Sequence, residues 1–223
     1  MCMEVHMKHD VKNGILDILS KIAEGVIAGI LISLGGAAFL ACYDPAIPYS
    51  RYVGALLFSL ALICICMLGY ALYTGKIGLV LEKHAKDDVS MLLLCLLGNA
   101  IGTIVCGYLL GWIMPSLKET ALTLCNGKLG QGYLFGLLRA VFCGLLVYLS
   151  VEIWRKHQTV VGIVFCIPAF ILSGFEHSIA DIFYFATSGI ASGEAFLYLI
   201  MIILGNSLGA LIIPALRLIK PKA

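Results

Sequence analysis

Charged side chains are scarce in this sequence. Lys, Arg, Asp and Glu make up 13% of its 223 residues, whereas they make up about 25% of a typical soluble domain. Hydrophobic residues account for 61%, and the mean hydropathy is +1.02. This composition excludes an ordinary soluble domain, and we predict an all-α integral membrane protein. The net charge of +2 gives no indication of a nucleic-acid partner.

Several signatures of export and catalysis are also missing. Residues 1–20 lack a basic stretch followed by an apolar run and a cleavage site, so we expect no cleaved signal peptide. The nine cysteines show neither a disulfide framework nor a metal-binding spacing. No CxxC, HExxH or nucleotide-binding loop occurs, so we expect no metal and no cofactor. A membrane-embedded thiol enzyme using Cys64, Cys66 or Cys143 is the least favoured alternative.

The sequence does contain apolar runs long enough to cross a bilayer. They predict six membrane spans, the second and fifth broken, at about 25–43, 52–73, 91–114, 132–154, 159–186 and 195–216. Residues 70–81, in which two glycines flank an apolar pentamer, are predicted to return into the protein as a re-entrant segment. The remaining segments are predicted as a cytoplasmic amphipathic helix within 1–24, an extracytoplasmic polar connection over 116–131 and a cytoplasmic tail over 217–223.

The fifth span carries ionisable residues at its interruption. Glu176, His177 and Asp181 lie in an otherwise apolar stretch, and Ser173 and Gly174 can loosen the helix just before them. An ionisable side chain at membrane depth is costly, so it normally faces a cavity, a partner or a conduction path. The pattern therefore predicts a substrate site on a discontinuous helix.

Basic residues gather on one set of connections between the spans. One set holds eleven, namely Lys8, Lys12, Lys21, Lys76, Lys83, Lys86, Arg155, Lys156, Arg217, Lys220 and Lys222. The other holds three, namely Arg51, Lys118 and Lys128. Because cytoplasmic connections carry the excess of Lys and Arg, both termini are predicted to be cytoplasmic.

The two halves of the chain contain similar motifs. Gly98-Asn-Ala-Ile-Gly102 in the third span recurs as Gly205-Asn-Ser-Leu-Gly209 in the sixth. Each follows a span with a glycine-marked break, near Gly69 and near Gly174. Two three-span units joined in this way lie in opposite orientations, so we predict an inverted repeat with halves 25–115 and 132–216.

These motifs also resemble those of a known family. Gly174-Phe-Glu-His-Ser-Ile-Ala180 followed by Phe183, the loop Leu72-Tyr-Thr-Gly75 and the paired GNxxG segments resemble the formate/nitrite transporter family. The resemblance covers nearly the whole chain from about Ala28 onward. It implies an aquaporin-like six-span protomer in a homopentamer of the cell (inner) membrane. Each protomer would have its own pore for a small monovalent anion such as formate, nitrite or hydrosulfide.

The resemblance implies that His177 is the central pore histidine. An imidazole titrates near neutrality, so it can lend a proton to a passing weak-acid anion and take it back. A core histidine satisfied by backbone groups is the alternative. Thr74 resembles the threonine placed opposite this histidine, where its hydroxyl can donate a hydrogen bond. A turn-stabilising threonine is compatible with the same position.

Other positions match the family's constriction and mouths. Phe58 and Leu62, four residues apart on one helical face, with Phe170 and Tyr73, match an apolar constriction, although plain packing is the usual meaning of such a pattern. Two lysines match the positions at the mouths of the pore, Lys128 outside and Lys21 inside. A lysine at each mouth would raise the local anion concentration.

The chain departs from the family pattern at several positions, among them Ala71, where an acidic residue is usual, and Lys76 after the loop glycine. Gly144 stands where an asparagine is usual, so an expected amide partner for His177 is missing, and Asp181 replaces a second asparagine. Glu176 is expected to brace the broken backbone or a neighbouring subunit. Arg139, inside the fourth span, can reach the interface, loop carbonyls or Glu176. These departures leave the identity of the substrate open.

We therefore predict a channel or transporter for small monovalent anions, with proton exchange at the histidine, and no enzymatic activity. A neutral-solute pore like an aquaglyceroporin is the alternative, because its architecture would be the same. The sequence lacks the paired Asn-Pro-Ala segments of such pores.

Overall fold

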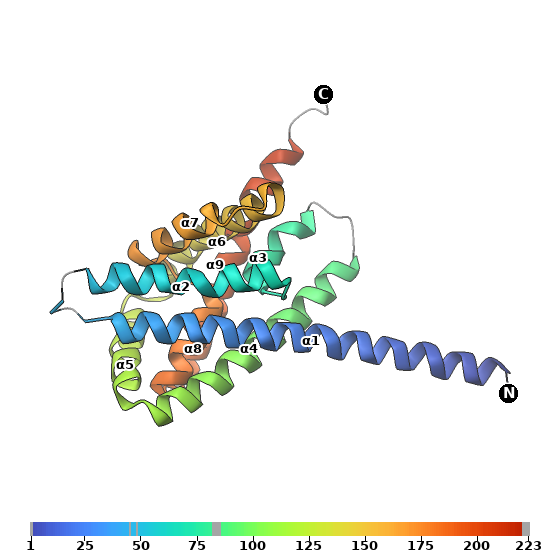
Figure 1. The fold of residues 1–223 in the computed structure, drawn as a ribbon, viewed down its shortest axis with the longest axis horizontal. Coiled ribbons are helices and arrows are strands. Elements are labelled where there is room, and N and C mark those ends of the chain that lie inside the picture. The colour runs from blue at the N-terminus through green and yellow to red at the C-terminus, as the bar shows by residue number, and fades with distance from the viewer. Residues whose placement is uncertain (1, 45, 48, 82–85, 220–223) are drawn as a thin grey trace.

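The computed structural model describes residues 2–44, 46–47, 49–81 and 86–219, without the side chains of 2–13 and 86–88. Every regular element in these ranges is a helix, as predicted (Figure 1). The elements are α1 (Cys2–Cys42), α2 (Ser50–Leu68), α3 (Tyr73–Lys76), the 3₁₀ helix η1 (Ile77–Leu81), α4 (Lys86–Ile113), α5 (Pro115–Gly130), α6 (Tyr133–His157), α7 (Val161–Leu172), α8 (Ser178–Ser188) and α9 (Gly193–Leu218). Of the lysines used above to predict orientation, six lie outside the described side chains: Lys8, Lys12, Lys83, Lys86, Lys220 and Lys222.

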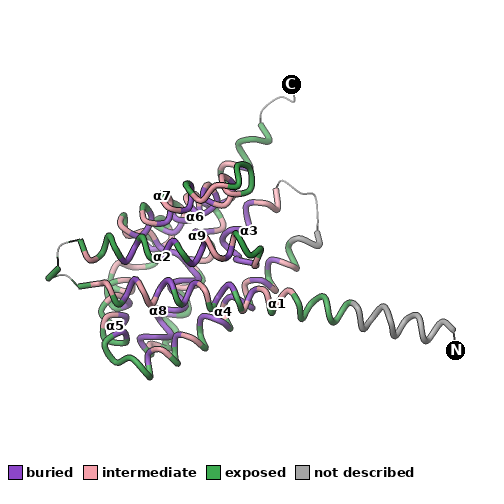
Figure 2. The backbone as a smooth tube through the Cα atoms, viewed as in Figure 1, coloured by how far each residue is buried: buried purple, intermediate pink, exposed green. Residues whose placement is uncertain are grey.

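Five helices of the described chain are long and apolar enough to cross a membrane. They are α1 from Gly14, α2, α4 from Val89, α6 and α9, and α7 is a shorter apolar helix. Large apolar side chains cover much of the outer surface, and Trp112 is 79% exposed. Figure 2 shows exposed residues on the outward faces of these helices and buried residues between them. An apolar exterior of this kind is suited to lipid, so the chain is a multi-pass membrane protein.

Glycines allow the main helix pairs to approach closely. On the crossing of α1 and α4, a Cβ atom added at Gly29 would lie 2.4 Å from the carbonyl oxygen of Asn99. On the crossing of α6 and α9, a Cβ atom at Gly209 would lie 1.9 Å from the carbonyl oxygen of Val141. Both GNxxG segments therefore mark a close helix crossing, which is the common use of small residues in membrane helices.

The N-terminal prediction needs a correction. A separate amphipathic helix within 1–24 was expected before a first span beginning near Gly25. Instead, α1 is one continuous helix that extends beyond the other helices (Figure 1). The helix continues because Gly25 does not end it. This glycine packs against α4, where a Cβ atom would lie 2.9 Å from the carbonyl oxygen of Cys95.

The polar connection expected over 116–131 is also different, because residues 115–130 form α5. Pro115 suits the first turn of a helix, where its missing N–H is not needed. Leu117, Ala121 and Cys125, spaced four residues apart, are buried on one face. Helix α5 packs against α8 along this face. The apolar residues within this polar segment therefore form the buried face of an amphipathic helix.

The backbone leaves helical geometry at two places inside the protein. Helix α2 ends at Gly69, with φ of 78°, and the chain returns through non-helical residues 70–72 into α3 and η1. Helix α7 ends at Leu172, and residues 173–177 lead into α8 through Gly174, with φ of 71°. Both glycines adopt a left-handed conformation that a side chain would strain. The two interruptions place Thr74 and His177 in the interior.

The tight crossing of α6 and α9 predicts a stability effect at Gly209. A Gly209→Ala substitution forces the helices apart, at a cost of about 1–3 kcal/mol for overpacking. We expect the thermal unfolding midpoint of the purified protein in detergent to fall by several degrees. Gly193→Ala on the same helix is the control, since no heavy atom lies within 4 Å of a Cβ added there. Equal midpoints for the two variants would contradict the close crossing.

Candidate functional site

His177 is the N-cap residue of α8. Its backbone is extended, with φ of −113° and ψ of 110°, and its Nδ1 accepts a hydrogen bond from the backbone N–H of Ala180 at 3.2 Å. An N-cap side chain satisfies one of the free N–H groups of the first helical turn. The interruption before α8 therefore determines the orientation of the imidazole ring, which is 3% exposed.

This contact determines which ring nitrogen can donate. A backbone N–H is always a donor, so Nδ1 is the acceptor, and the proton of the neutral ring lies on Nε2. Nε2 lies 2.9 Å from Oγ1 of Thr74, which accepts this proton in a hydrogen bond. Thr74 belongs to α3, 103 residues away in the sequence. The fold thus brings together the two residues predicted to face each other.

Two buried asparagines hold the interruptions in place. Asn99 Oδ1 accepts from the N–H of Tyr73 at 2.8 Å, and Nδ2 donates to the carbonyls of Ala71 and Gly25 at 2.9 and 2.8 Å. Asn206 Oδ1 accepts from the N–H of Ser178 at 2.8 Å. Its Nδ2 donates at 2.8 and 2.9 Å to two further carbonyls, those of Glu176 and Ala140. Each GNxxG asparagine therefore satisfies backbone groups that a continuous helix would have paired internally.

Apolar rings surround the imidazole. The ring of Phe170 stacks on that of His177, with centroids 5.6 Å apart and an interplanar angle of 18°. Phe58 meets Phe170 edge-on at 6.3 Å. Both phenylalanines are almost completely buried, as is Leu62, one turn after Phe58 on α2. Phe170 and Phe58 therefore pack beside the histidine, and Leu62 follows on the same helix. Tyr73, the fourth residue predicted for the constriction, is also buried, and its hydroxyl forms a hydrogen bond with Oγ of Ser207 at 2.8 Å.

Two cavities approach this region along α2. The histidine cavity, of about 270 Å³, is lined by His177, Phe58 and Phe170 and lies along the N-terminal half of α2. The Leu62 cavity, of about 170 Å³, lies along the C-terminal half of α2 and is lined by Leu62, Gly69 and Gly75. The two cavities share no lining residue. Phe58 lines the first cavity, and Leu62, one turn later on α2, lines the second.

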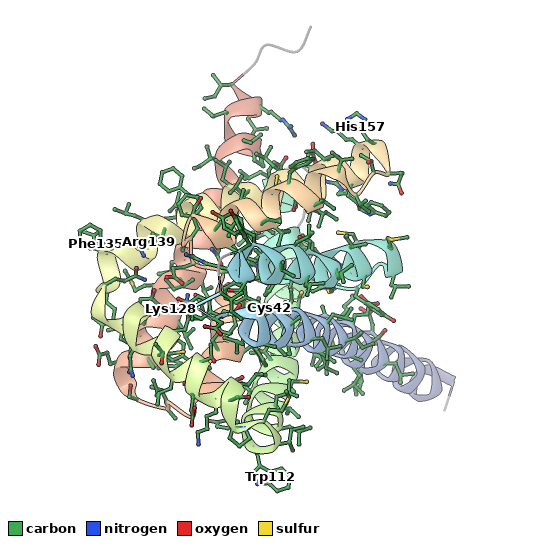
Figure 3. All side chains as sticks on the ribbon, turned by 60° about the vertical axis from the view of Figure 1, so that its left-hand side comes forward. Cys42, Trp112, Lys128, Phe135, Arg139 and His157 are labelled. Carbon is green, nitrogen blue, oxygen red and sulfur yellow. The ribbon has the colours of Figure 1, made fainter. Side chains whose placement is uncertain are left out.

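Lys128 lines the histidine cavity but is not a free cation there. Its ammonium contacts the Glu176 carboxylate and lies 2.9 Å from Oδ1 of Asp181. The ammonium also lies 5.8 Å from the ring centroid of Tyr184. Figure 3 shows Lys128 within the body of the molecule, while Trp112 projects from its surface. Two carboxylates therefore neutralise the positive charge expected to attract anions.

Sequence reasoning missed Gln131, which organises this cluster. Its Nε2 donates to Oε1 of Glu176 at 2.8 Å and contacts the hydroxyl of Tyr198. Its Oε1 accepts from Arg139, so this arginine bonds to a side chain that was not among the expected partners. Gln131 follows Lys128 by three residues at the end of α5, a spacing that places both side chains on one face. That spacing could have identified it.

Three further basic residues lie near cavities. Arg51, on α2, donates to the carbonyl of Ile171 at 3.0 Å, and both it and Arg139 line the histidine cavity. Lys21 pairs with Asp17 and lines a third cavity, of about 360 Å³, with Glu24 and Lys76. The predicted inner lysine thus does line a cavity, in an ion pair. The histidine cavity is lined by two arginines, Arg51 and Arg139, that were not predicted to line a cavity.

Comparison with known proteins identifies the family. The sequence matches the family described as "Formate/nitrite transporter" over residues 3–219. The chain belongs to the formate/nitrite transporter family. This is a family of transporters and not of enzymes, which excludes the thiol enzyme.

Three curated relatives of this family member are informative. It is 28% identical to formate-nitrite transporter 2 of Toxoplasma gondii over 213 residues, which cover 84% of this chain and 46% of the relative. It is 28% identical to the formate channel FocB of Escherichia coli over 178 residues, covering 70% and 62%. It is 29% identical to the uncharacterized transporter YrhG of Bacillus subtilis over 150 residues, covering 60% and 56%. The chain thus spans about half the length of the curated relatives it matches.

Solved structures share the fold of this formate/nitrite transporter family member. A pentameric formate channel with formate bound superposes with a TM-score of 0.78 at 22% identity, covering 91% of this chain and 96% of that one. An FNT family ion channel superposes with a TM-score of 0.76 at 23% identity, covering 90% and 89%.

Gly144 has a structural reason to be glycine. A Cβ atom added there would lie 2.1 Å from the carbonyl oxygen of Asn206. No amide side chain could occupy this position without separating α6 from α9. Gly144 therefore offers His177 no amide side chain. The ring has Thr74 and Ala180 as partners, and the amide that reaches the neighbouring charges comes from Gln131.

The contacts of Asn206 predict a strong effect of its removal. An Asn206→Ala substitution leaves the N–H of Ser178 and the carbonyls of Glu176 and Ala140 without this partner, at about 1–3 kcal/mol for each buried group left unsatisfied. We expect a clear fall in the thermal midpoint and in the monodisperse fraction during gel filtration. The exposed Asn126→Ala on α5 is the control. Equal stability of both variants would mean that Asn206 does not hold the interruption.

Proposed function

We propose that this protein is a pore for small monovalent anions in the cell (inner) membrane. The observation that carries the proposal is the buried hydrogen bond between Thr74 and His177, with one cavity lined by His177 and a second lined by Leu62 and Gly75. A buried hydrogen-bond donor surrounded by apolar rings can contact a small anion that has lost most of its water. Formate and nitrite, named for the relatives, and hydrosulfide are the proposed substrates.

We propose six crossings, of which α7 and α8 together make one, and an inverted repeat of 25–115 and 132–216. Asn99 and Asn206 support the repeat, since each bonds the backbone of one interruption in the same way. Both termini are cytoplasmic in this arrangement, and the histidine cavity opens to the outside. The apolar outer surface favours a homopentamer in the lipid bilayer, the assembly of the similar formate channel.

Anion entry depends on Arg51 and Arg139 in this proposal. Because Glu176 and Asp181 neutralise Lys128, the two arginines are the cations of the histidine cavity that attract an anion. The anion then loses water between Phe58 and Phe170 and accepts the hydrogen bond that Nε2 of His177 otherwise gives to Thr74. It leaves past Leu62.

Proton exchange at His177 requires the doubly protonated ring. In that form Nδ1 becomes a donor and must release the N–H of Ala180. The proposed cycle therefore includes a short-lived imidazolium that gives its proton to the weak-acid anion, which crosses the apolar barrier as the neutral acid and then returns the proton to His177, so that one negative charge crosses.

Flux measurements test the proposed function. Vesicles containing the purified protein should take up formate, nitrite or hydrosulfide, and their current should depend on the anion. His177→Asn should reduce uptake on the order of tenfold, because the amide cannot exchange a proton. His157→Asn, at the exposed end of α6, is the matched control. Uptake of all three anions equal to that of empty vesicles would refute the function, and anion-independent passage of neutral solutes would favour the neutral pore.

If Arg51 and Arg139 attract the anion, anion uptake should depend on the salt concentration. Arg139→Gln removes one attracting charge, so anion uptake at low ionic strength should fall several-fold. The difference should vanish at high salt, where charges more than about 3–10 Å apart are screened. Lys118→Gln, on the exposed face of α5, should leave uptake unchanged at both salt concentrations. A loss for Arg139→Gln that persists at high salt would contradict electrostatic attraction.

A further inference from the structure

The cluster beside the histidine has more acidic than basic groups. Lys128 contacts Glu176 and lies 2.9 Å from Oδ1 of Asp181. The side chains of Glu176 and Asp181 are 4% and 1% exposed. When both carboxyl groups are ionised, the cluster has one negative charge in excess. An uncompensated charge in such a buried place is strongly unfavourable.

The two carboxyl groups have different numbers of hydrogen-bond donors around them. Glu176 has contacts with Lys128 and with Nε2 of Gln131. Asp181 uses Oδ1 for Lys128, whereas its Oδ2 is buried and has no hydrogen-bond partner. A buried carboxylate oxygen without a donor is costly, so one donor is missing from this cluster.

The two carboxyl groups also lie close to each other, because both contact the ammonium of Lys128. Two ionised carboxylates repel at this separation, whereas a carboxyl and a carboxylate form a strong hydrogen bond through one proton. One proton on the pair therefore supplies the missing donor and brings the charge of the cluster to zero. Such a pair titrates as a unit.

The groups around Asp181 come from several elements. They are Lys128 and Cys125 on α5, Cys143 on α6, Tyr184 on α8, Tyr198 on α9, and Glu176 and His177 in the interruption. Arg51, Arg139 and Tyr43 line the same cavity, and α4 packs on α8 through Gly107 and Gly111. Of these groups, Lys128 is the cation in direct contact with Asp181.

We propose that Glu176 and Asp181 share one proton beside Lys128, and that anions pass the histidine cavity readily only while this proton is bound. The proposal rests on the proposed anion pore. Asp181 lines that cavity one helical turn from His177, and its N–H donates to the carbonyl of His177 at 2.8 Å. Release of the proton to water in the cavity leaves a negative charge on the cavity wall, which repels the anion.

The test compares Asp181→Asn with the wild type over a pH series. The amide has the shape of the carboxyl group and cannot ionise, so the cluster stays neutral at every pH. We measure formate uptake into vesicles from pH 6 to pH 9 and take the ratio of variant to wild type, which cancels the pH dependence of formate itself. The ratio should rise from near one to about tenfold as the wild-type pair loses its proton.

Glu119→Gln, on the exposed face of α5, is the control, and its ratio should stay near one. A ratio for Asp181→Asn that is constant with pH, while both proteins transport formate, would overturn the shared proton and leave the proposed function intact. Absence of transport by the wild type at every pH would instead overturn the proposed function and this inference together.

Infrared spectroscopy tests the proton directly and does not require a stable variant. The wild-type protein should show the carbonyl band of a buried protonated carboxyl group at neutral pH. This band should disappear over the pH range in which wild-type uptake falls. A wild type without any such band at neutral pH would overturn the proposal, even if Asp181→Asn failed to fold.

Discussion

The structure depends on how two stretches of non-helical backbone are satisfied inside a membrane protein. Within lipid, an unpaired N–H or carbonyl group costs several kcal/mol, so a chain can leave helical geometry only where other protein groups replace its internal hydrogen bonds. Asn99 and Asn206 do this for the interruptions before α3 and α8. The glycines around each asparagine allow the helices to approach closely enough for these bonds to form.

The functional residues follow from this constraint. Because α8 begins inside the protein, His177 can cap it with Nδ1, and Nε2 is left to face Thr74 on the other interrupted segment. Phe58 and Phe170 pack beside the imidazole in the cavity that His177 lines, and a second cavity lies further along α2. A polar pair in an apolar barrier is thus a direct result of two interruptions meeting.

Local spacing in the sequence was sufficient to predict some of these features but not others. The positions of both interruptions followed from glycines in apolar runs, and the interior placement of His177 followed from the cost of an ionisable group at membrane depth. The continuous α1 and the amphipathic α5 were missed, because tertiary packing overrides weak local signals at Gly25 and within 116–131. Lys128 does line the histidine cavity, but its ion pairing was not predicted, since no local pattern shows that two carboxylates from another segment neutralise it.

Composition and residues within one or two turns of each other are enough to show that the chain is helical, apolar and interrupted. Which groups meet depends on the tertiary structure. The bond from His177 to Thr74, the exclusion of any side chain at Gly144 and the pairing of Lys128 with Glu176 and Asp181 each join different helices. Contacts of this kind depend on how helices cross, and the crossing is set by close packing over the whole fold.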